Sequence, residues 1–453
     1  MLERKLPKVV IRELDIYTPV IKDEENFTIE KKYFDKYDTN KYLHFPVILN
    51  DDDKTLWKYG NLFLLNKIKI NSEIDSQTLK SKRLNLELFK KWVDKENIGY
   101  LSSPKRKFLG PVYQYRRYLN GLMSNNEIAP KTLQNRIGAI VEFYKYLIKE
   151  EGFEFKYSLW DDSVILINIT DREGFQRVIK KETRDVSKIK NTRILNNEES
   201  YIKDGSNLIP LEKEVQSILV EILNKSKNIE MRLSFFLSLT TGARIQSIFT
   251  LRIKHFEKPV SENDSFINVK IGYGTLCDTK YGKQNILKIP VYIYNMIRVY
   301  IKSPRGQSRR SRSKHIFDNN NDCYVFMNNR GIPYYCAKND PYKILYSDSI
   351  NGVAIRQFIC NTLRKEFKNY GIDFTHSFHD LRATFLMNYY DSKINLVDKG
   401  IMTISQLLIN MMQLVGHSSL TITEGYMNFR NKNKIKEYLQ DDYEKHLEDL
   451  IHG

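Results

Sequence analysis

The chain has few cysteines and no long apolar run, and these two shortages exclude several classes of protein. Its 453 residues include four cysteines, at positions 277, 323, 336 and 360. They are too few and too widely spaced for a disulfide framework or a Cys-x-x-Cys zinc site, so we expect free thiols in a reducing cytoplasm. No apolar stretch is long enough to span a bilayer, and the first residues, Met-Leu-Glu-Arg-Lys, lack the apolar core of a signal peptide. We therefore expect neither a membrane protein nor a secreted one.

Acidic residues are too scarce to balance the basic ones. The sequence holds 72 Lys and Arg against 55 Asp and Glu, which gives a formal net charge of +17. Such a surface attracts polyanions, so nucleic acid is the first candidate partner and an anionic membrane surface the second. The lack of a membrane segment favours nucleic acid. Hydrophobic residues make up 41% of the chain, enough for a core, and its length suggests two or three domains.

We divide the chain into four segments. Residues 1–70 form an N-terminal β-containing segment of strands and turns, which includes the short apolar run Leu62-Phe63-Leu64-Leu65 and has no recognisable role. Residues 74–150 carry three apolar stripes at helical spacing, the third entered at Pro130, and predict a compact helical domain. Residues 151–205 lose this periodicity and are interpreted as a basic linker. Residues 206–453 predict a mixed domain with a C-terminal helix.

Three groups of basic residues are candidates for contact with nucleic acid. The helical segment has a basic side formed by Lys105, Arg106, Lys107, Arg116 and Arg117. The linker carries Arg172, Arg177, Lys180, Lys181, Arg184, Lys188, Lys190 and Arg193, and Lys180 and Lys181 are its main candidates. Either group would also suit an ordinary solvated surface, but the overall charge favours DNA. A further basic run from Arg305 to Lys314 has no apolar pattern and predicts a mobile loop.

The pattern after residue 206 predicts helices broken by one hairpin. Helices are expected over 212–225 and 231–239, followed by a turn at Thr241-Gly242 and another helix through Ile248. Strands are expected over 266–271 and 286–291, with a hairpin turn near Gly282. Residues 325–327 are strand-like, and the remainder is helical. The whole chain therefore predicts a mainly α fold with a small β-sheet, of the α+β class.

Six residues in this C-terminal half have the side chains that a reaction at a phosphodiester needs. They are Arg244, Lys280, His379, Arg382, His417 and Tyr426. Their contexts are Thr-Gly-Ala-Arg (241–244), Thr-Lys-Tyr-Gly-Lys (279–283), His-Asp-Leu-Arg (379–382), Leu-Val-Gly-His (414–417) and Glu-Gly-Tyr (424–426). Two arginines, a lysine and two histidines can bind and neutralise one phosphodiester, and a tyrosine can attack it.

The chemistry explains why these residue types belong together. A tyrosine that attacks a phosphodiester keeps the bond energy in a covalent ester, which a DNA hydroxyl can reverse. The pentavalent transition state carries extra negative charge, which the paired donors of arginine stabilise. The leaving 5′ oxygen needs a proton, which a lysine can give, and the tyrosine proton needs a base such as histidine. The sequence has no Gly-rich phosphate loop and no carboxylate cluster, which fits a reaction without nucleotide or metal.

Each of the six residues, taken alone, has an ordinary non-catalytic interpretation. Arg244 suits a surface arginine after a helix-start turn, and His379 with Arg382 suits a pair on one helix face. His417 suits a histidine at a helix end, and a lysine in a hairpin such as Lys280 normally aids solubility. Tyr426 is one of 29 tyrosines. Only the set as a whole favours catalysis.

The order and contexts of the six residues resemble the tyrosine recombinase (phage integrase) family. The family's first arginine stands in Thr-Gly-x-Arg, its second box is His-x-Leu-Arg, and its last histidine precedes the tyrosine by nine positions, as His417 precedes Tyr426 here. Its lysine lies on a β-hairpin, often just before a glycine, which suits Lys280 better than Lys283. The resemblance covers roughly residues 206–430. It extends less specifically to 74–150, where the family has a helical core-binding domain that clamps DNA.

This resemblance implies a role for each residue. Tyr426 would attack the scissile phosphate and keep the 3′ end, while Lys280 protonates the leaving oxygen. His379 would handle the tyrosine proton. The phosphate oxygens would be held by Arg244, Arg382 and His417. It also implies the fold of a tyrosine-recombinase-like catalytic domain and a reaction that needs no cofactor.

Four features depart from the family's pattern. The third position after the first arginine is usually acidic but is Ser247 here, which removes an expected support for Arg244. Arg382 and His417 are farther apart than in compact members, which predicts an insertion over 387–405. The histidine box contains Val415 between its leucine and glycine. Residues 1–70 match nothing in the family.

The resemblance leads to one expectation of function and several of partners. We expect a site-specific recombinase or integrase of a mobile genetic element that acts on double-stranded DNA as a homotetramer, with accessory DNA-bending proteins, in the cytoplasm and nucleoid of a bacterium. The apolar stripe after Tyr426 suits either docking on its own domain or packing on a neighbouring protomer, and we favour the neighbour. The alternatives are a type IB topoisomerase, a DNA-binding protein without catalysis and, more distantly, a metal-dependent nuclease.

Overall fold

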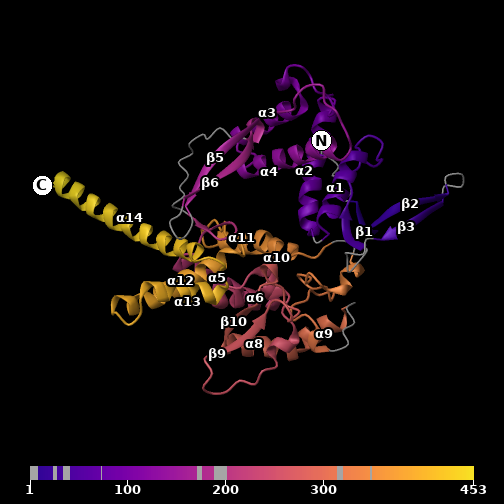
Figure 1. Cartoon of the computed structure of the whole chain (residues 1–453). Coiled ribbons are helices and arrows are strands. Elements are labelled where there is room, and N and C mark those ends of the chain that lie inside the picture. Colours follow the sequence, from indigo (N-terminus) through magenta and orange to yellow (C-terminus); the bar gives the residue numbers. More distant parts are fainter. Residues whose placement is uncertain are drawn as a thin grey trace. The chain divides into compact units, whose positions relative to one another are not determined.

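The structure, a computed structural model, describes residues 9–23, 28–33, 41–72, 74–170, 176–187, 201–313, 320–346 and 349–452. The chain folds into two compact units (Figure 1). The N-terminal unit comprises residues 1–194 with 346–349, and the C-terminal unit comprises residues 195–345 with 350–453. Helices dominate the described residues, and the strands form small two-stranded antiparallel sheets. The predicted mainly α class with small sheets is therefore confirmed.

The N-terminal unit consists of four helices and three strand pairs within the described residues. Its helices are α1 (Lys58–Ile70), α2 (Ser76–Lys95), α3 (Pro111–Ser124) and α4 (Pro130–Lys149). Its strands are β1 (Val10–Asp15) paired with β4 (Lys41–Pro46), β2 (Tyr17–Asp23) paired with β3 (Thr28–Tyr33), and β5 (Asp162–Thr170) paired with β6 (Gln176–Arg184). Aromatic residues, among them Phe63, Phe89, Tyr115 and Tyr144, fill the core between the helices.

The three helices expected between residues 74 and 150 are present as α2, α3 and α4. Proline at the first position of α3 and α4 fixes the backbone angle φ at a helical value. It costs no hydrogen bond, because an amide at this position has no partner within the helix. α1 was not expected. The run at 62–65, which the sequence pattern assigns to a strand-and-turn segment, lies inside this helix because Gly60, Phe63, Leu64 and Ile68 bury one side of it.

The interpretation of residues 151–205 as a linker is wrong for residues 162–187. Strands β5 and β6 pair along their whole length, from Asp162 opposite Arg184 to Thr170 opposite Gln176. The chain then returns to the helices, where Val186 is fully buried and the hydroxyl of Tyr113 donates to Asp185. The sequence of this hairpin does not alternate cleanly between apolar and polar residues, because apolar residues such as Leu166 are exposed instead of facing a core.

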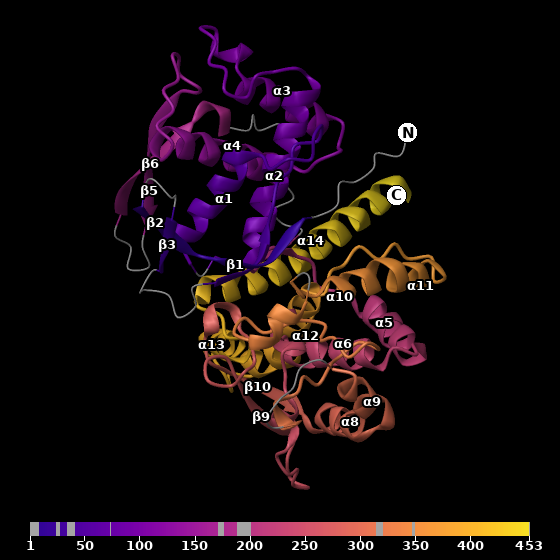
Figure 2. The same cartoon turned by 90° about the vertical axis from the view of Figure 1, so that its right-hand side faces the viewer.

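The C-terminal unit packs its helices around a core that contains α6 (Figures 1 and 2). Its helices are α5 (Lys213–Lys225), α6 (Ile229–Thr241), α7 (Ile245–Phe249), α8 (Val291–Lys302), α9 (Pro304–Ser311), α10 (Val353–Phe358), α11 (Arg364–Lys368), α12 (Asp380–Asp398), α13 (Ile404–Val415) and α14 (Leu420–His452). Its strand pairs are β7 (Ile202–Lys203) with β8 (Asn207–Leu208), and β9 (Phe266–Ile271) with β10 (Asn285–Pro290).

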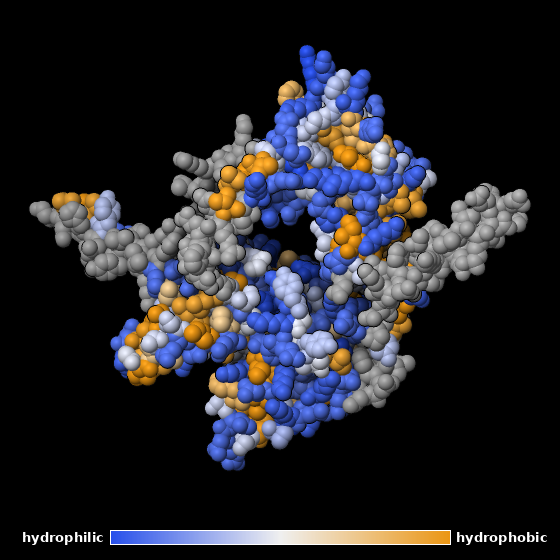
Figure 3. All heavy atoms as spheres, in the orientation of Figure 1, coloured by the Kyte–Doolittle hydropathy of each residue, from blue (hydrophilic) through white to orange (hydrophobic). Residues whose placement is uncertain are grey.

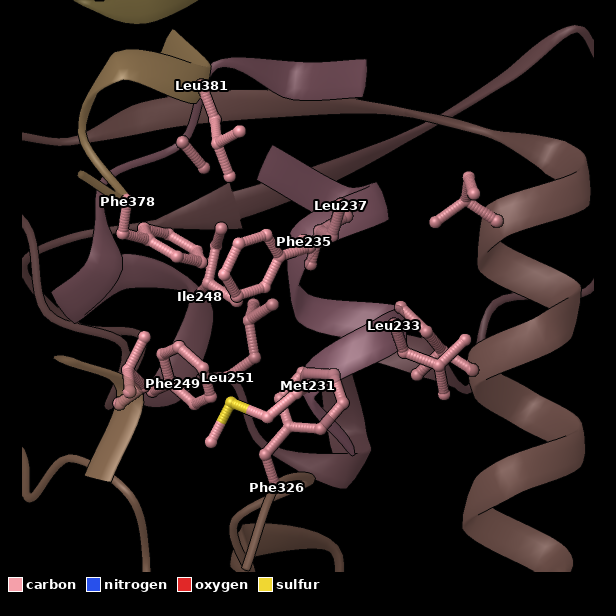
Figure 4. Close-up of a cluster of buried hydrophobic side chains, with 14 of the residues drawn as sticks. Met231, Leu233, Phe235, Leu237, Ile248, Phe249, Leu251, Phe326, Phe378 and Leu381 are labelled. Carbon is pink, nitrogen blue, oxygen red and sulfur yellow. The ribbon is translucent and has the colours of Figure 1, made fainter. Parts of the chain in front are cut away.

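Figure 4 shows the core of this unit. Met231 and Phe235 of α6 meet Phe249 of α7, with Phe326 and Phe378 from later segments closing the cluster. The expected hairpin over 266–291 is present, and burial along β9 alternates strictly, as a half-buried strand requires. Polar residues cover much of the face in Figure 3, with apolar residues in smaller patches. None of the described helices is long and apolar enough to cross a membrane.

The prediction of a mobile loop over 305–314 is wrong for residues 305–311. These residues form α9, which begins at Pro304 and is capped by Ser303, whose hydroxyl accepts from the amide of Gly306. Arg305 binds the carboxylate of Glu230 through two bonds of 2.8 Å, and Arg309 approaches it to 3.0 Å. Because Glu230 is fully buried, it requires such counterions, so these arginines stabilise the fold.

Candidate active site

A left-handed turn after α6 places Arg244. Gly242 has φ 64°, and a Cβ there would lie 2.6 Å from Cδ1 of Phe385 and 2.8 Å from Cγ1 of Val415. Both the backbone angle and the close packing therefore require glycine. Two residues later Arg244 directly precedes α7, and 22% of its side chain is exposed. The Thr-Gly-Ala-Arg motif thus positions its arginine through the glycine.

The start of α12 places His379 and Arg382. Asp380 fixes this start because its buried carboxylate accepts from the amides of Ser377 and Ile209, at 2.7 and 2.8 Å. Arg382 lies on the first turn and is only 1% exposed. Its Nη1 donates to the carbonyl of Gly242 at 2.9 Å, and its Nη2 donates to that of Val415 at 3.1 Å. Arg382 therefore joins α12 to the ends of α6 and α13.

The connection between α13 and α14 places His417 and Tyr426. Gly416 ends α13 with φ 69°, and His417 follows before α14 begins. The hydroxyl of Thr423 lies 3.0 Å from Nδ1 of His417, and the rings of His417 and Tyr426 stack with centroids 5.8 Å apart. Tyr426 lies on the second turn of α14 and is fully buried. The nine-residue spacing therefore brings histidine and tyrosine side by side.

Five of the six predicted residues meet at Asp204, four of them at its carboxylate and the fifth at its backbone carbonyl. This residue lies between β7 and β8 and is 2% exposed. Its Oδ2 lies 2.8 Å from Nε of Arg382, 3.0 Å from Nε2 of His417 and 3.2 Å from Oη of Tyr426. Its Oδ1 lies 3.4 Å from Nη2 of Arg244, and its backbone carbonyl oxygen lies 3.0 Å from Nε2 of His379. The cluster is therefore a closed anion site.

Burial and charge set the protonation states in this cluster. Burial by itself would raise the pKa of Asp204, but the hydrogen bond from His417 and the charge of Arg382 outweigh it and hold that pKa far below its usual range. Burial lowers the pKa of both His379 and His417. Burial, together with the charge of Asp204, raises the pKa of Tyr426 well above its usual range. At neutral pH the cluster therefore holds an ionised Asp204, neutral histidines and a protonated tyrosine.

The partners of His417 indicate its tautomer. A neutral imidazole donates through one nitrogen and accepts through the other. A proton on Nε2 of His417 can be donated to Asp204, and Nδ1 can then accept from the hydroxyl of Thr423. His379 likewise carries its proton on Nε2, because its partner there is a carbonyl oxygen. Both histidines thus direct a donor at the same residue.

Lys280 lines a pocket beside this cluster. The pocket is lined by Arg244, Arg382, Lys280 and Lys283, among others. Lys280 is exposed in the connection between β9 and β10, and its Nζ lies 5.4 Å from the centre of the Tyr281 ring. Nζ of Lys283 donates to the carbonyl of His417 at 3.3 Å. Both lysines therefore border the site, and the assignment of Lys280 stays a prediction.

The remaining predicted DNA contacts lie in the N-terminal unit. Lys105, Arg106 and Arg117 are exposed there, and so are Lys180 and Lys181 on β6. Arg116 is half-buried, and Lys107 forms an ion pair with Asp161. Arg172, Lys188, Lys190 and Arg193 lie outside the described residues. The exposed lysines and arginines can bind a phosphate, whereas Lys107 already has an acidic partner.

Asp204 is the residue that the sequence did not indicate. Ser247, at the position where an acidic residue was expected, is buried, and its carbonyl accepts from the thiol of Cys277. Asp204 supplies the acidic partner of Arg244 from a position 40 residues earlier in the sequence. Lys-Asp-Gly-Ser (203–206) reads as an ordinary turn, so no local signal could have found it.

Comparisons with known proteins add a likeness of overall structure. No protein-family model matches the chain, and no curated protein matches its sequence. An integrase of the Tn1549 transposon in complex with circular intermediate DNA is 14% identical over 81% of this chain and 94% of its own, with a TM-score of 0.42. The XerH site-specific recombinase bound to difH is 13% identical over 85% of this chain and 90% of its own, with a TM-score of 0.44. A lambda integrase dimer bound to a COC′ core site is 12% identical over 82% of this chain and 95% of its own, with a TM-score of 0.43. Likeness at this level says nothing about chemistry, which has to come from the side chains.

Proposed function

We propose that the chain is a site-specific DNA recombinase that cleaves and rejoins DNA strands through a tyrosine nucleophile. The observation that best supports this function is the meeting of three groups at one point. Oη of Tyr426, Nε2 of His417 and Nε of Arg382 all lie within 3.2 Å of Oδ2 of Asp204. A carboxylate oxygen resembles a non-bridging phosphate oxygen in charge and in the donors it accepts. The cluster is therefore suited to a phosphodiester that faces a tyrosine.

The proposed reaction gives each group one task. Tyr426 loses its proton to the unprotonated ring nitrogen of neutral His379 and attacks the phosphorus, and the bond from phosphorus to the 5′ oxygen breaks as Lys280 protonates that oxygen. The products are a 3′-phosphotyrosine and a free 5′ hydroxyl. Arg244, Arg382 and His417 donate to the oxygens on which charge develops. Attack by a 5′ hydroxyl on the phosphotyrosine reverses these steps and rejoins a strand.

The partners follow from the same proposal. The substrate is double-stranded DNA, and strand exchange between two sites needs a homotetramer. The far end of α14 supports such an assembly, because Tyr443, Leu450 and Ile451 are 62%, 66% and 73% exposed. Apolar residues so exposed at the end of a helix suit packing on a neighbouring protomer. We further propose a role in a mobile element of a bacterium, at the nucleoid, with accessory DNA-bending proteins.

Covalent trapping tests this function. The full chain is incubated in chelator with a nicked duplex that carries the flanking sequence of its native locus, so that the short 5′ product diffuses away after cleavage. We expect a protein–DNA adduct that survives denaturation, with the DNA attached to the peptide that contains Tyr426. An adduct attached elsewhere, or cleavage lost in chelator, would contradict the proposal. Relaxation of plasmid without a specific site by monomeric protein would identify a topoisomerase instead.

The role of Lys280 can be separated from that of Lys283 by the leaving group. Replacement of Lys280 by alanine should slow adduct formation by about 10²-fold or more, because the 5′ oxygen then leaves without a proton. A substrate with sulfur in place of that bridging oxygen needs no proton and should restore the rate. Lys283→Ala is the matched control and should gain nothing from sulfur. Rescue of Lys283→Ala in place of Lys280→Ala would assign the proton to Lys283.

A further inference from the structure

Asp204 occupies the position that the scissile phosphate needs in the proposed reaction. The hydroxyl of Tyr426 faces Oδ2 of Asp204 at 3.2 Å, and a nucleophile must face the phosphorus group that it attacks. Tyr426 is fully buried, and Arg382 and His417 are 1% and 4% exposed. DNA therefore cannot reach these groups while Asp204 stays in the cluster.

The carboxylate and a phosphodiester cannot share this site. Both carry a negative charge and both need the donors of Arg382 and His417. Two unit charges of like sign a few ångströms apart in a poorly solvated site repel by several kcal/mol at an effective dielectric constant of about 20. Arrival of the phosphate therefore requires departure of Asp204. With the phosphate in place, each donor that now binds Asp204 regains an anionic partner.

Two of the donors, Arg382 and His417, do not depend on Asp204 alone for their positions. Arg382 keeps its bonds to the carbonyls of Gly242 and Val415, and His417 keeps its contact with Thr423. A residue that only braced the site would be the main support of these side chains. Asp204 is instead one partner among several, and it uses the atoms that would bind substrate.

The turn that carries Asp204 is suited to movement about fixed ends. Residues 203–206, here called the Asp204 turn, lie between Ile202 of β7 and Asn207 of β8, and Ile202 and Leu208 are buried in the core beside α12 and α14. Within the turn the Asp204 amide donates to the carbonyl of Ser206, and Gly205 has φ 76°. Gly205 and Ser206 are exposed. Rotation within these few residues can withdraw the carboxylate while both ends stay packed.

We propose that the Asp204 turn is an autoinhibitory element that fills the phosphate site until bound DNA displaces it. This inference rests on the proposed function and adds a step to it. The enzyme exists in a closed state with Asp204 bound and an open state in which Tyr426 and its donors are accessible. DNA binding favours the open state, so the rate of cleavage depends on how often the turn is open.

Substitution of Asp204 tests the proposal by the sign of its effect. Asp204→Asn keeps the size and removes the charge, and Asp204→Ala removes the side chain. If the open state is about a tenth populated in the wild type, both variants should form the covalent adduct roughly tenfold faster on the nicked duplex. Slower adduct formation by both variants would show that Asp204 braces the site and would overturn the proposal. Asp340→Asn is the matched control: it alters another buried carboxylate that pairs with an arginine, Arg252, and should leave the rate unchanged.

A second readout separates this proposal from the proposed function. Inorganic phosphate should raise the melting temperature of Asp204→Asn and Asp204→Ala, because the emptied site binds an anion, and should not raise that of the wild type or Asp340→Asn. If no protein forms an adduct but phosphate stabilises only the Asp204 variants, Asp204 does fill an anion-binding site, and the proposed recombinase function is contradicted. If the wild type forms the adduct while phosphate stabilises no variant, the function stands and the autoinhibitory turn is overturned.

Discussion

Replacement of Tyr426 by phenylalanine should abolish the covalent adduct while the protein still binds DNA. Phenylalanine fills the same volume and keeps the stacking on His417, whose ring centre lies 5.8 Å away, but it lacks the attacking oxygen. Adduct formation should therefore fall by roughly 10³-fold or more. Only the hydrogen bond to Asp204 is lost from the fold, so the free energy of unfolding should drop by no more than about 1–2 kcal/mol. Denaturing gels measure the first quantity and urea unfolding the second.

Tyr390→Phe is the matched control for this experiment. Tyr390 is 3% exposed and belongs to the same buried cluster as Tyr426, but its hydroxyl contacts Asn431 at 3.5 Å and lies outside the anion site. We expect wild-type adduct formation from this variant. An adduct that persists in Tyr426→Phe and disappears in Tyr390→Phe would move the nucleophile to Tyr390.

The motifs indicated residues that the structure brings together, because each motif fixes its residue through local geometry. Gly242 and Gly416 both adopt left-handed angles that end a helix, and each precedes a site residue by one or two positions. His379 and Arg382 share the first turn of one helix. Such short-range constraints can be read from the sequence, and the structure brings five of the six residues into contact with one residue, Asp204. Their catalytic roles stay predictions.

Asp204 could not be predicted because its role depends on distant residues. The partners of its side chain, Arg244, Arg382, His417 and Tyr426, follow it by 40 to 222 positions. Nothing in an Asp-Gly turn distinguishes an exposed carboxylate from one that enters a cationic site. Only the packing of β7 and β8 against the helices decides between the two. The same holds for Arg305 and Arg309: their basic run indicates a loop, but both pair with the buried Glu230, which lies far from them in the sequence.

Two further errors have a common physical cause. α1 and the β5–β6 hairpin were missed because their apolar residues do not follow a simple period in the sequence. In α1 a run at 62–65 obscures the helical spacing of its buried side. In the hairpin, Val164, Leu166 and Val178 are each 61% exposed, so pairing between backbones rather than burial forms the strands. Hydrophobic periodicity detects the buried face of a helix or strand, and it gives no signal for a strand whose apolar residues are exposed.

Replacement of Arg382 by alanine should reduce both catalysis and stability. The variant leaves the buried carboxylate of Asp204 without its closest cation and two carbonyls without their donor. Breaking a buried pair in this way costs about 3–5 kcal/mol in the free energy of unfolding. Loss of a fixed donor to the transition state should slow adduct formation by about 10²–10³-fold. Urea unfolding and single-turnover cleavage measure the two effects separately.

Arg244→Ala and a double variant separate the loss of cleavage rate from the loss of stability and assign each to an interaction. Arg244 touches Asp204 through one contact of 3.4 Å and is partly exposed, so its removal should slow cleavage to a similar extent with a much smaller loss of stability. Combining Asp204→Ala with Arg382→Ala removes the unpaired carboxylate and should recover part of the stability without recovering cleavage. If Arg382→Ala cleaves at the wild-type rate, Arg382 serves only the fold. If the double variant is no more stable than Arg382→Ala, the two carbonyls rather than Asp204 account for the destabilisation.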